Sequence, residues 1–196
     1  MSANTSFNII RCMKEEMSIQ GDLTKELAEQ WANSIDDVAA AILANLDQQH
    51  FFPLLDLSGL DELSDAAAES LSKHEGDLDL YGLKKLSDAA AESLSKHKGD
   101  LVLSGLTEVS DAAVESLSKH EGELHLGPRK LSDAAAKSLS KHKGYLHLEF
   151  LDELSDAAAE SLSKHQEGLS LNGRIEISAA GEKSLSKYRG VLAYVV

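Results

Sequence analysis

A twelve-residue segment recurs along this 196-residue chain, and its recurrence constrains the fold more than any other feature. The string "LSDAAAESLSKH" stands unchanged at three places, and three related copies accompany it. In chain order the copies are Leu63–His74, Leu86–His97, Val109–His120, Leu131–His142, Leu154–His165 and Ile177–Tyr188. They begin 23, 23, 22, 23 and 23 residues apart. A constant period of this length predicts a solenoid, in which each repeat buries its apolar face only by stacking on its neighbours.

Each repeat divides into a strand half and a helix half. The strand half has the pattern L-x-L, as in "LDLSGL" at Leu55–Leu60, and places both leucines on one face. The helix half begins at Ser64 or Asp65, either of which suits a helix start. We expect about ten helical residues, with Lys73 in the last turn and Gly76 as the C′ residue.

Stacking these units predicts an α/β solenoid with one parallel sheet. Strands pack at ~4.8 Å and helices at ~8–10 Å, so the stack bends with the strands on the concave side and the helices on the convex side. At the helix spacing, histidines that end each repeat would lie ~9 Å apart, too far for two rings to share a zinc ion.

The unit resembles a leucine-rich repeat of the ribonuclease-inhibitor-like kind, in a divergent 23-residue form of bacterial type. The L-x-L pairs match that family's strand, and "LSDAAAESL" is similar to its entry into the helix. The resemblance covers about Leu55–Val196 and implies a right-handed solenoid. The family's turn asparagine is replaced by leucine, so we expect Gly59, Gly82 and Gly105 to make the turn.

Two domains follow from the repeat boundaries. Residues 1–54 carry no full repeat and are predicted to form an N-terminal helical cap, or a helix that docks on a partner. Within them, Ser34–Leu46 aligns with "ELSDAAAESLSKH" as a degenerate half-repeat. Residues 55–196 form a leucine-rich-repeat-like solenoid of about six repeats plus a final strand. That strand, "VLAYVV", is apolar on both faces and is a candidate for self-association through Leu192, Tyr194, Val195 and Val196.

Charge and composition narrow the partners. A net charge of −14 disfavours nucleic acid and anionic membranes, and favours a basic or mixed-charge protein. Cys12 is the only cysteine, which excludes intrachain disulfides. We find no signal peptide pattern and no apolar run near the ~18 residues of a membrane span, so we expect a cytoplasmic protein.

Ser, Asp and His recur in every full repeat without forming a catalytic set. Ser64 and His74 lie at opposite ends of one predicted helix, roughly 15 Å apart at 1.5 Å per residue. We therefore expect the repeated histidines to form a structural column at the helix C-termini, with Tyr188 in the same place in the last copy.

The residues that vary between copies flank the strand leucines and point to the concave face. They form our candidate partner-binding surface: Asp56, Asp77, Asp79, Tyr81, Asp100, Val102, Glu123, His125, Tyr145, His147, Glu149 and Ser170. The first half is acidic, and the second places His125 and His147 on neighbouring strands about 5 Å apart. With Glu123 and Glu149, these histidines could hold a divalent metal, contact a partner, or form ordinary solvated surface.

The sequence assembles no active site, because it has no phosphate-binding glycine loop, activated nucleophile or cofactor fingerprint. We expect a non-enzymatic protein-protein interaction module without a cofactor or an assigned metal. Tyr81 and Tyr145 would anchor the partner. The alternative is a structural or scaffolding protein that self-associates through its C-terminal strand or N-terminal helices.

Overall fold

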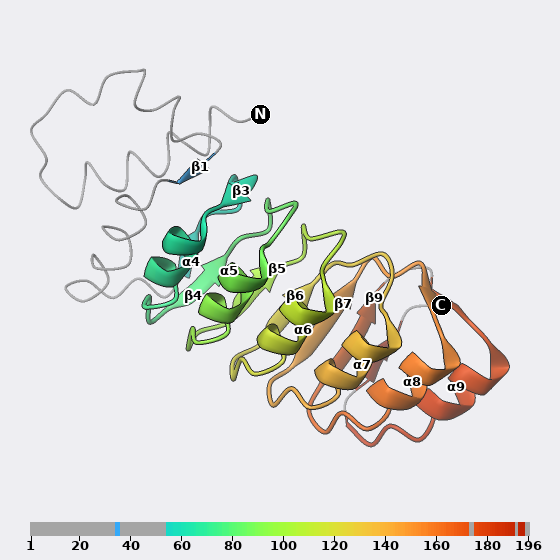
Figure 1. The fold of residues 1–196 in the computed structure, drawn as a ribbon. Coiled ribbons are helices and arrows are strands. Elements are labelled where there is room, and N and C mark those ends of the chain that lie inside the picture. Colours follow the sequence, from blue (N-terminus) through green and yellow to red (C-terminus); the bar gives the residue numbers. More distant parts are fainter. Residues whose placement is uncertain (1–33, 36–53, 173–174, 191, 195–196) are drawn as a thin grey trace, which may run out of the picture.

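The protein is a stack of repeated strand and helix units, seen in a computed structural model that describes residues 34–35, 54–172, 175–190 and 192–194. One strand of each unit joins a seven-stranded parallel sheet with the order β11-β9-β7-β6-β5-β4-β2. The strands are β2 (Leu54–Asp56), β4 (Asp77–Asp79), β5 (Leu101–Leu103), β6 (Leu124–Leu126), β7 (Leu146–Glu149), β9 (Leu169–Asn172) and β11 (Leu192–Tyr194). The helices form a second layer along one side of the sheet (Figure 1). A repeat solenoid is thus what the period predicts and what the structure has.

The register of the sheet follows the repeat. Leu78 pairs with Leu101, which pairs with Leu124, and the ladder continues through the first leucine of each later strand. Residues of the L-x-L pattern alternate, so that Leu101 and Leu103 are buried while Val102 faces outward. We call the outward side of this sheet, opposite the helices, the strand face.

Each described helix has seven residues, three fewer than the sequence predicts. The helices are α4 (Asp65–Leu71), α5 (Asp88–Leu94), α6 (Asp111–Leu117), α7 (Asp133–Leu139), α8 (Asp156–Leu162) and α9 (Ala179–Leu185). In the first, Ser64 is the N-cap, and its side chain accepts a hydrogen bond from the Ala67 amide. The chain leaves the helix at Ser72, so Lys73 lies in the following turn rather than in the last helical turn.

The aspartate at each helix start links neighbouring repeats. The Ser87 hydroxyl, itself an N-cap, donates a hydrogen bond to the Asp65 carboxylate of the preceding repeat. The same contact joins Ser110 to Asp88 and recurs through the stack, ending with Ser178 and Asp156. Each of these aspartates therefore stands at a positive helix end and accepts a charge-assisted hydrogen bond.

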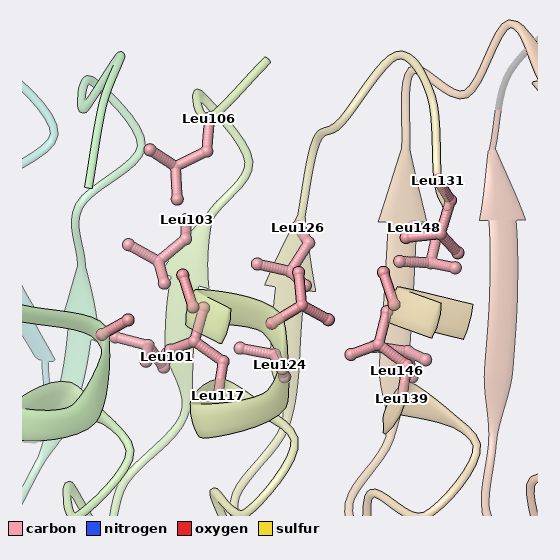
Figure 2. Packing of buried hydrophobic residues seen from close by; sticks show 14 of the residues in the cluster. Leu101, Leu103, Leu106, Leu117, Leu124, Leu126, Leu131, Leu139, Leu146 and Leu148 are labelled. Carbon is pink, nitrogen blue, oxygen red and sulfur yellow. The ribbon is translucent and has the colours of Figure 1, made fainter. Parts of the chain in front are cut away.

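The core lies between the sheet and the helices. Strand leucines such as Leu101 and Leu103 meet Leu117 of α6, and the same layer repeats along the stack (Figure 2). Ala113 and Val114 complete the buried helix face. The small alanine side chains let the helices lie close to the sheet. Burial of one leucine side chain contributes about 1.5–3 kcal/mol to the free energy of folding.

The glycines act by close packing rather than by ending helices. A Cβ atom on Gly99 would lie 2.1 Å from the carbonyl oxygen of Gly76, so backbone stacks on backbone between repeats. The prediction that Gly76 is a C′ residue is wrong, because α4 ends five residues before it. The prediction that a glycine makes the turn after each strand is confirmed at Gly82. The Leu83 amide donates a hydrogen bond to the Leu80 carbonyl across Tyr81 and Gly82. A Cβ on Gly82 would lie 2.3 Å from the Ser58 carbonyl oxygen.

Short pairs of parallel strands also lie just before some of the helices. The sequence did not predict these strand pairs. Strand β3 (Glu62–Leu63) pairs with β1 (Ser34–Ile35), and β8 (Glu153–Leu154) pairs with β10 (Glu176–Ile177). Ser34 faces Glu62 and Ile35 faces Leu63, which is the register of the proposed half-repeat alignment. Apart from Leu54, which begins β2, the remainder of the predicted N-terminal cap lies outside the described residues.

Candidate functional site

The strand face carries the variable residues in rows that follow the strands. The residue between the two leucines of each strand is paired in register with its neighbours, so Asp56, Asp79, Val102, His125, His147 and Ser170 form one continuous row. The sequence predicted this row correctly. Ser170 is an exception in exposure, because only 4% of it is accessible.

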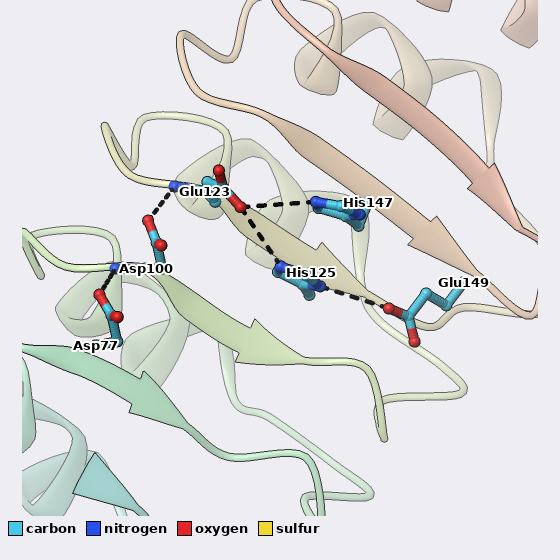
Figure 3. Close-up of polar contacts among 6 residues, drawn as sticks. All are labelled: Asp77, Asp100, Glu123, His125, His147 and Glu149. Carbon is cyan, nitrogen blue, oxygen red and sulfur yellow. Dashed lines mark hydrogen bonds and ion pairs between the residues drawn. The ribbon is translucent and has the colours of Figure 1, made fainter. Parts of the chain in front are cut away.

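In the acidic half of the strand face, the aspartate carboxylates accept hydrogen bonds from the protein's own backbone. The Asp77 carboxylate accepts from the Asp100 amide at 2.9 Å, and the Asp100 carboxylate accepts from the Glu123 amide at 2.9 Å (Figure 3). Asp56 and Asp79 hold the turns that follow their strands, because each accepts from the amide two residues ahead. These aspartates are therefore also structural residues, a role that the sequence reasoning missed.

Asp56 and Asp79 are in-register neighbours and both carry carboxylates. Burial raises the pKa of Asp79, while the hydrogen bond from the Tyr81 amide lowers it and the adjacent Asp56 raises it further. Two close carboxylates on a partly buried surface favour a positive group placed beside them. This part of the strand face is suited to a lysine or arginine side chain.

The other half gathers aromatic rings and carboxylates. His125 of β6 and His147 of β7 are paired in register, and their rings stack with centroids 3.9 Å apart, slightly closer than the sequence predicts. The Tyr145 ring stacks on His147 with a centroid distance of 4.6 Å. Glu123 and Glu149 lie at either side of the pair (Figure 3).

Carboxylate oxygens approach three of the ring nitrogens. One Glu123 oxygen lies 3.7 Å from Nε2 of His147 and 3.9 Å from Nε2 of His125. On the other side, an oxygen of Glu149 lies 3.4 Å from Nδ1 of His125. Burial lowers the pKa of His147, and the nearby His125 lowers it further, while Glu123 and Glu149 oppose the change. The cluster contains two imidazoles and a carboxylate whose ligand atoms lie within 4.8 Å of one another.

Tyr145 is held inside this arrangement rather than presented to solvent as a free anchor. Its ring covers Gly168 of the next repeat so closely that a Cβ there would lie 2.1 Å from the ring edge. The glycine is displaced by one residue in this repeat, and the displacement makes room for the tyrosine. Tyr145 therefore packs against both Gly168 and the His147 ring.

Exposed apolar side chains mark other parts of the surface. Tyr81 is 46% exposed, which fits its predicted role as an anchor. Leu54 and Phe150 are also exposed, and the sequence reasoning did not select them. Phe150 occupies the turn position that other repeats give to glycine, with φ of 65°, so its departure from the repeat was the available signal.

The repeated histidines form the expected column on the helix side. Their side chains are buried, and successive rings are parallel at 6.1–6.2 Å, with Tyr188 stacked on His165 at 6.5 Å. The expected spacing of ~9 Å is wrong. The rings follow the helix end, where the chain turns back toward the sheet, so their spacing lies between that of strands and that of helices.

Burial disfavours the charged form of four column histidines, which are His97, His120, His142 and His165. Burial, together with the flanking His120 and His74 rings, lowers the pKa of His97 to about 4. Burial likewise lowers the pKa of His142 to about 4. Backbone carbonyls nearby favour the charged form, but the ring nitrogens of His97 and His142 make no hydrogen bond of normal geometry. These histidines are neutral packing groups at pH 7.

At the far end of the stack, Leu192 and Tyr194 belong to β11, which pairs in parallel with β9 and forms one edge of the sheet. Val195 and Val196, the other self-association candidates, lie outside the described residues. None of the described helices is both long and apolar enough to cross a membrane.

Comparison of the chain with protein-family models and with curated proteins found no match. The class that the fold defines is a strand–helix repeat solenoid.

Proposed function

We propose that this chain is a non-enzymatic protein-protein interaction module that binds its partner on the strand face. We further propose that it is a right-handed leucine-rich-repeat-like solenoid with an N-terminal cap, whose strand face is concave. Parallel crossover connections are right-handed in nearly all proteins, which supports that hand. We also propose a cytoplasmic location, with which the single cysteine is consistent.

One observation carries the proposal: the strand face varies from repeat to repeat, whereas the buried positions of the stack hardly vary. The helix caps, the buried alanines and the inward leucines repeat almost unchanged because they stack on copies of themselves. The in-register row between the leucines runs from Asp to Val to His within four strands. On the strand face, backbone hydrogen bonds between strands hold the repeats together. The side chains there can therefore vary to recognise a particular partner.

The chemistry of the strand face favours a basic or mixed-charge protein. Asp56 and Asp79 lie side by side at one end, and the exposed Tyr81 ring follows them in the adjacent turn. A partner's lysine or arginine would relieve the repulsion between the carboxylates, and Tyr81 would supply apolar contact area. Tyr145 and the buried Ser170 contribute less than the sequence suggested.

The test places a photo-crosslinking residue at position 102, in the middle of the strand face. The matched control carries the same residue at position 92, on the exposed side of α5. The proposal expects a specific protein adduct from position 102, lost when Tyr81→Ser is added, and none from position 92. Equal adducts from both positions, or adducts from position 92 alone, would contradict binding on the strand face.

Self-association is the alternative, and the edge position of β11 favours it. An edge strand presents unpaired backbone groups to another chain. Sedimentation with and without residues 191–196 tests this function. A change from dimer to monomer on truncation supports it, and a monomer in both cases removes its basis.

A further inference from the structure

We propose that Glu123, His125 and His147 form a binding site for a divalent transition metal with zinc-like ligand preferences. The site lies on the strand face, and it does not depend on the proposed partner-binding function. Three donors converge there, two imidazole Nε2 atoms and one carboxylate oxygen, from two neighbouring strands.

The sheet itself brings the donors together. Glu123 immediately precedes β6 and stands two residues before His125, so both side chains lie on the outward side of the sheet, and His147 is the in-register partner of His125. The Glu123 oxygen is 3.7 Å and 3.9 Å from the two Nε2 atoms. Ligands ~2.1 Å from a tetrahedral zinc lie roughly 3.4 Å apart, so small side-chain rotations close the site.

Glu149 supplies a second, independent feature of a metal site. Its carboxylate accepts from Nδ1 of His125 at 3.4 Å. A proton on Nδ1 leaves the lone pair on Nε2, the atom that faces Glu123. A carboxylate behind a ligating histidine fixes the tautomer and ring orientation and raises the basicity of the ligand. Tyr145, stacked on His147, restricts the orientation of the second ring.

The place of Glu123 in the stack explains why its carboxylate faces the histidines. On the two preceding strands, Asp77 and Asp100 each accept from the next backbone amide. Glu123 continues that row with one more methylene, and its carboxylate lies against the histidines instead. The Glu123 side chain is 47% exposed, so a metal can enter, and water or a partner's side chain can occupy the fourth position.

The test titrates the metal-free full chain with Zn²⁺ by calorimetry and with Co²⁺ by visible absorption. We expect one strong equivalent and the intense bands of four-coordinate Co²⁺. The double variant His125→Ala/His147→Ala should lose that equivalent. Glu149→Gln keeps the shape of the side chain but removes its charge, and should weaken binding 10- to 100-fold.

Two control variants locate the bound metal. Glu160→Gln lies on α8, away from the strand face, and His50→Ala removes the histidine outside the described residues. Both should bind Zn²⁺ as the unaltered chain does. The proposal is overturned if the unaltered chain binds no Zn²⁺ at millimolar concentration, or if the double variant binds with unchanged stoichiometry and affinity. It is also overturned if binding is lost in His50→Ala alone.

Discussion

The described residues contain two sets of stacked histidines, and the two sets have different surroundings. The column on the helix side is buried, its rings lie 6.1–6.2 Å apart, and burial holds the pKa of His97 and His142 at about 4. The pair on the strand face, His125 and His147, is partly exposed, with rings 3.9 Å apart and carboxylates around it.

The difference shows how to tell scaffold from site in a repeat protein. Column histidines recur because each packs against its own copy in the next repeat, so their number reflects architecture. The pair occurs once, where Asp and Val stand on earlier strands. Polar groups that converge at one place in a stack, with a supporting carboxylate, are the better candidates for chemistry.

The largest expected effect is acid destabilisation through the column. An unfolded histidine binds a proton below its pKa of 6.5, whereas His97 and His142 in the fold do so only near 4. The free energy of unfolding should therefore be highest above pH 6.5 and fall as the pH is lowered to 4. Each of the two contributes about 3 kcal/mol to that loss. Urea unfolding at a series of pH values measures it.

The matched control for acid destabilisation is His125→Ala/His147→Ala. It should keep most of the pH dependence, because the column remains. His97 is flanked by His74 and His120 and lies near Asp77, so those groups modulate the midpoint. A stability that is constant from pH 7 to pH 5 would show that the column is protonated or hydrated in the fold.

Removing one ring from the column should cost less than acid but more than any strand-face change. His120→Ala leaves a cavity between His97 and His142, and we expect a loss of about 2–4 kcal/mol of unfolding free energy. His147→Ala on the strand face should cost less than about 1 kcal/mol. Both losses of unfolding free energy are measured by urea unfolding. Equal losses in the two variants would contradict the view that only the column is structural.

Among the repeated polar residues, the aspartates at the helix starts should have an intermediate effect. Asp111→Ala removes the acceptor for the Ser132 hydroxyl and a favourable charge at the start of α6. We expect a loss of about 1–2 kcal/mol. The natural Ala179 at the same position of α9 provides a reference, because Ala179→Asp should change the unfolding free energy by less than about 0.5 kcal/mol.

The smallest effect belongs to the exposed ion pairs of the helix layer. Glu160 and Lys164 are four residues apart with N and O atoms at 3.1 Å, and both side chains are exposed. Glu160→Gln should lower the unfolding free energy by no more than about 0.5 kcal/mol, and less in high salt. A larger loss would mean that the helix layer depends on surface charge as well as on its core.

The period and the leucine pattern were sufficient to predict the parallel sheet, the order of strands and the row that contains His125 and His147. They succeed because stacked copies must align identical residues. The end of each helix was harder to predict. Nothing in "ESLSKH" marks Ser72 as the cap, because the chain turns there to close each coil of the solenoid.

The candidate site was only partly visible in the sequence. The sequence placed His125 and His147 together. The hydrogen bond of Glu149 with Nδ1 of His125 depends on the rotamer of the glutamate, which a sequence pattern does not reveal. The internal hydrogen bonds of Asp77 and Asp100 join strands that are 23 residues apart in sequence, so a local pattern does not reveal them. The burial of Ser170 likewise arises from packing between repeats.

The most direct test of the contrast between the two sets is a long-range ¹H–¹⁵N spectrum of the histidine rings at pH 7, recorded with and without one equivalent of Zn²⁺. We predict neutral rings for His97, His120, His142 and His165, no zinc-induced change in the column, and large zinc-induced shifts confined to His125 and His147. Zinc-induced shifts within the column, or an unaffected His125 and His147, would contradict the division into a structural set and a functional set.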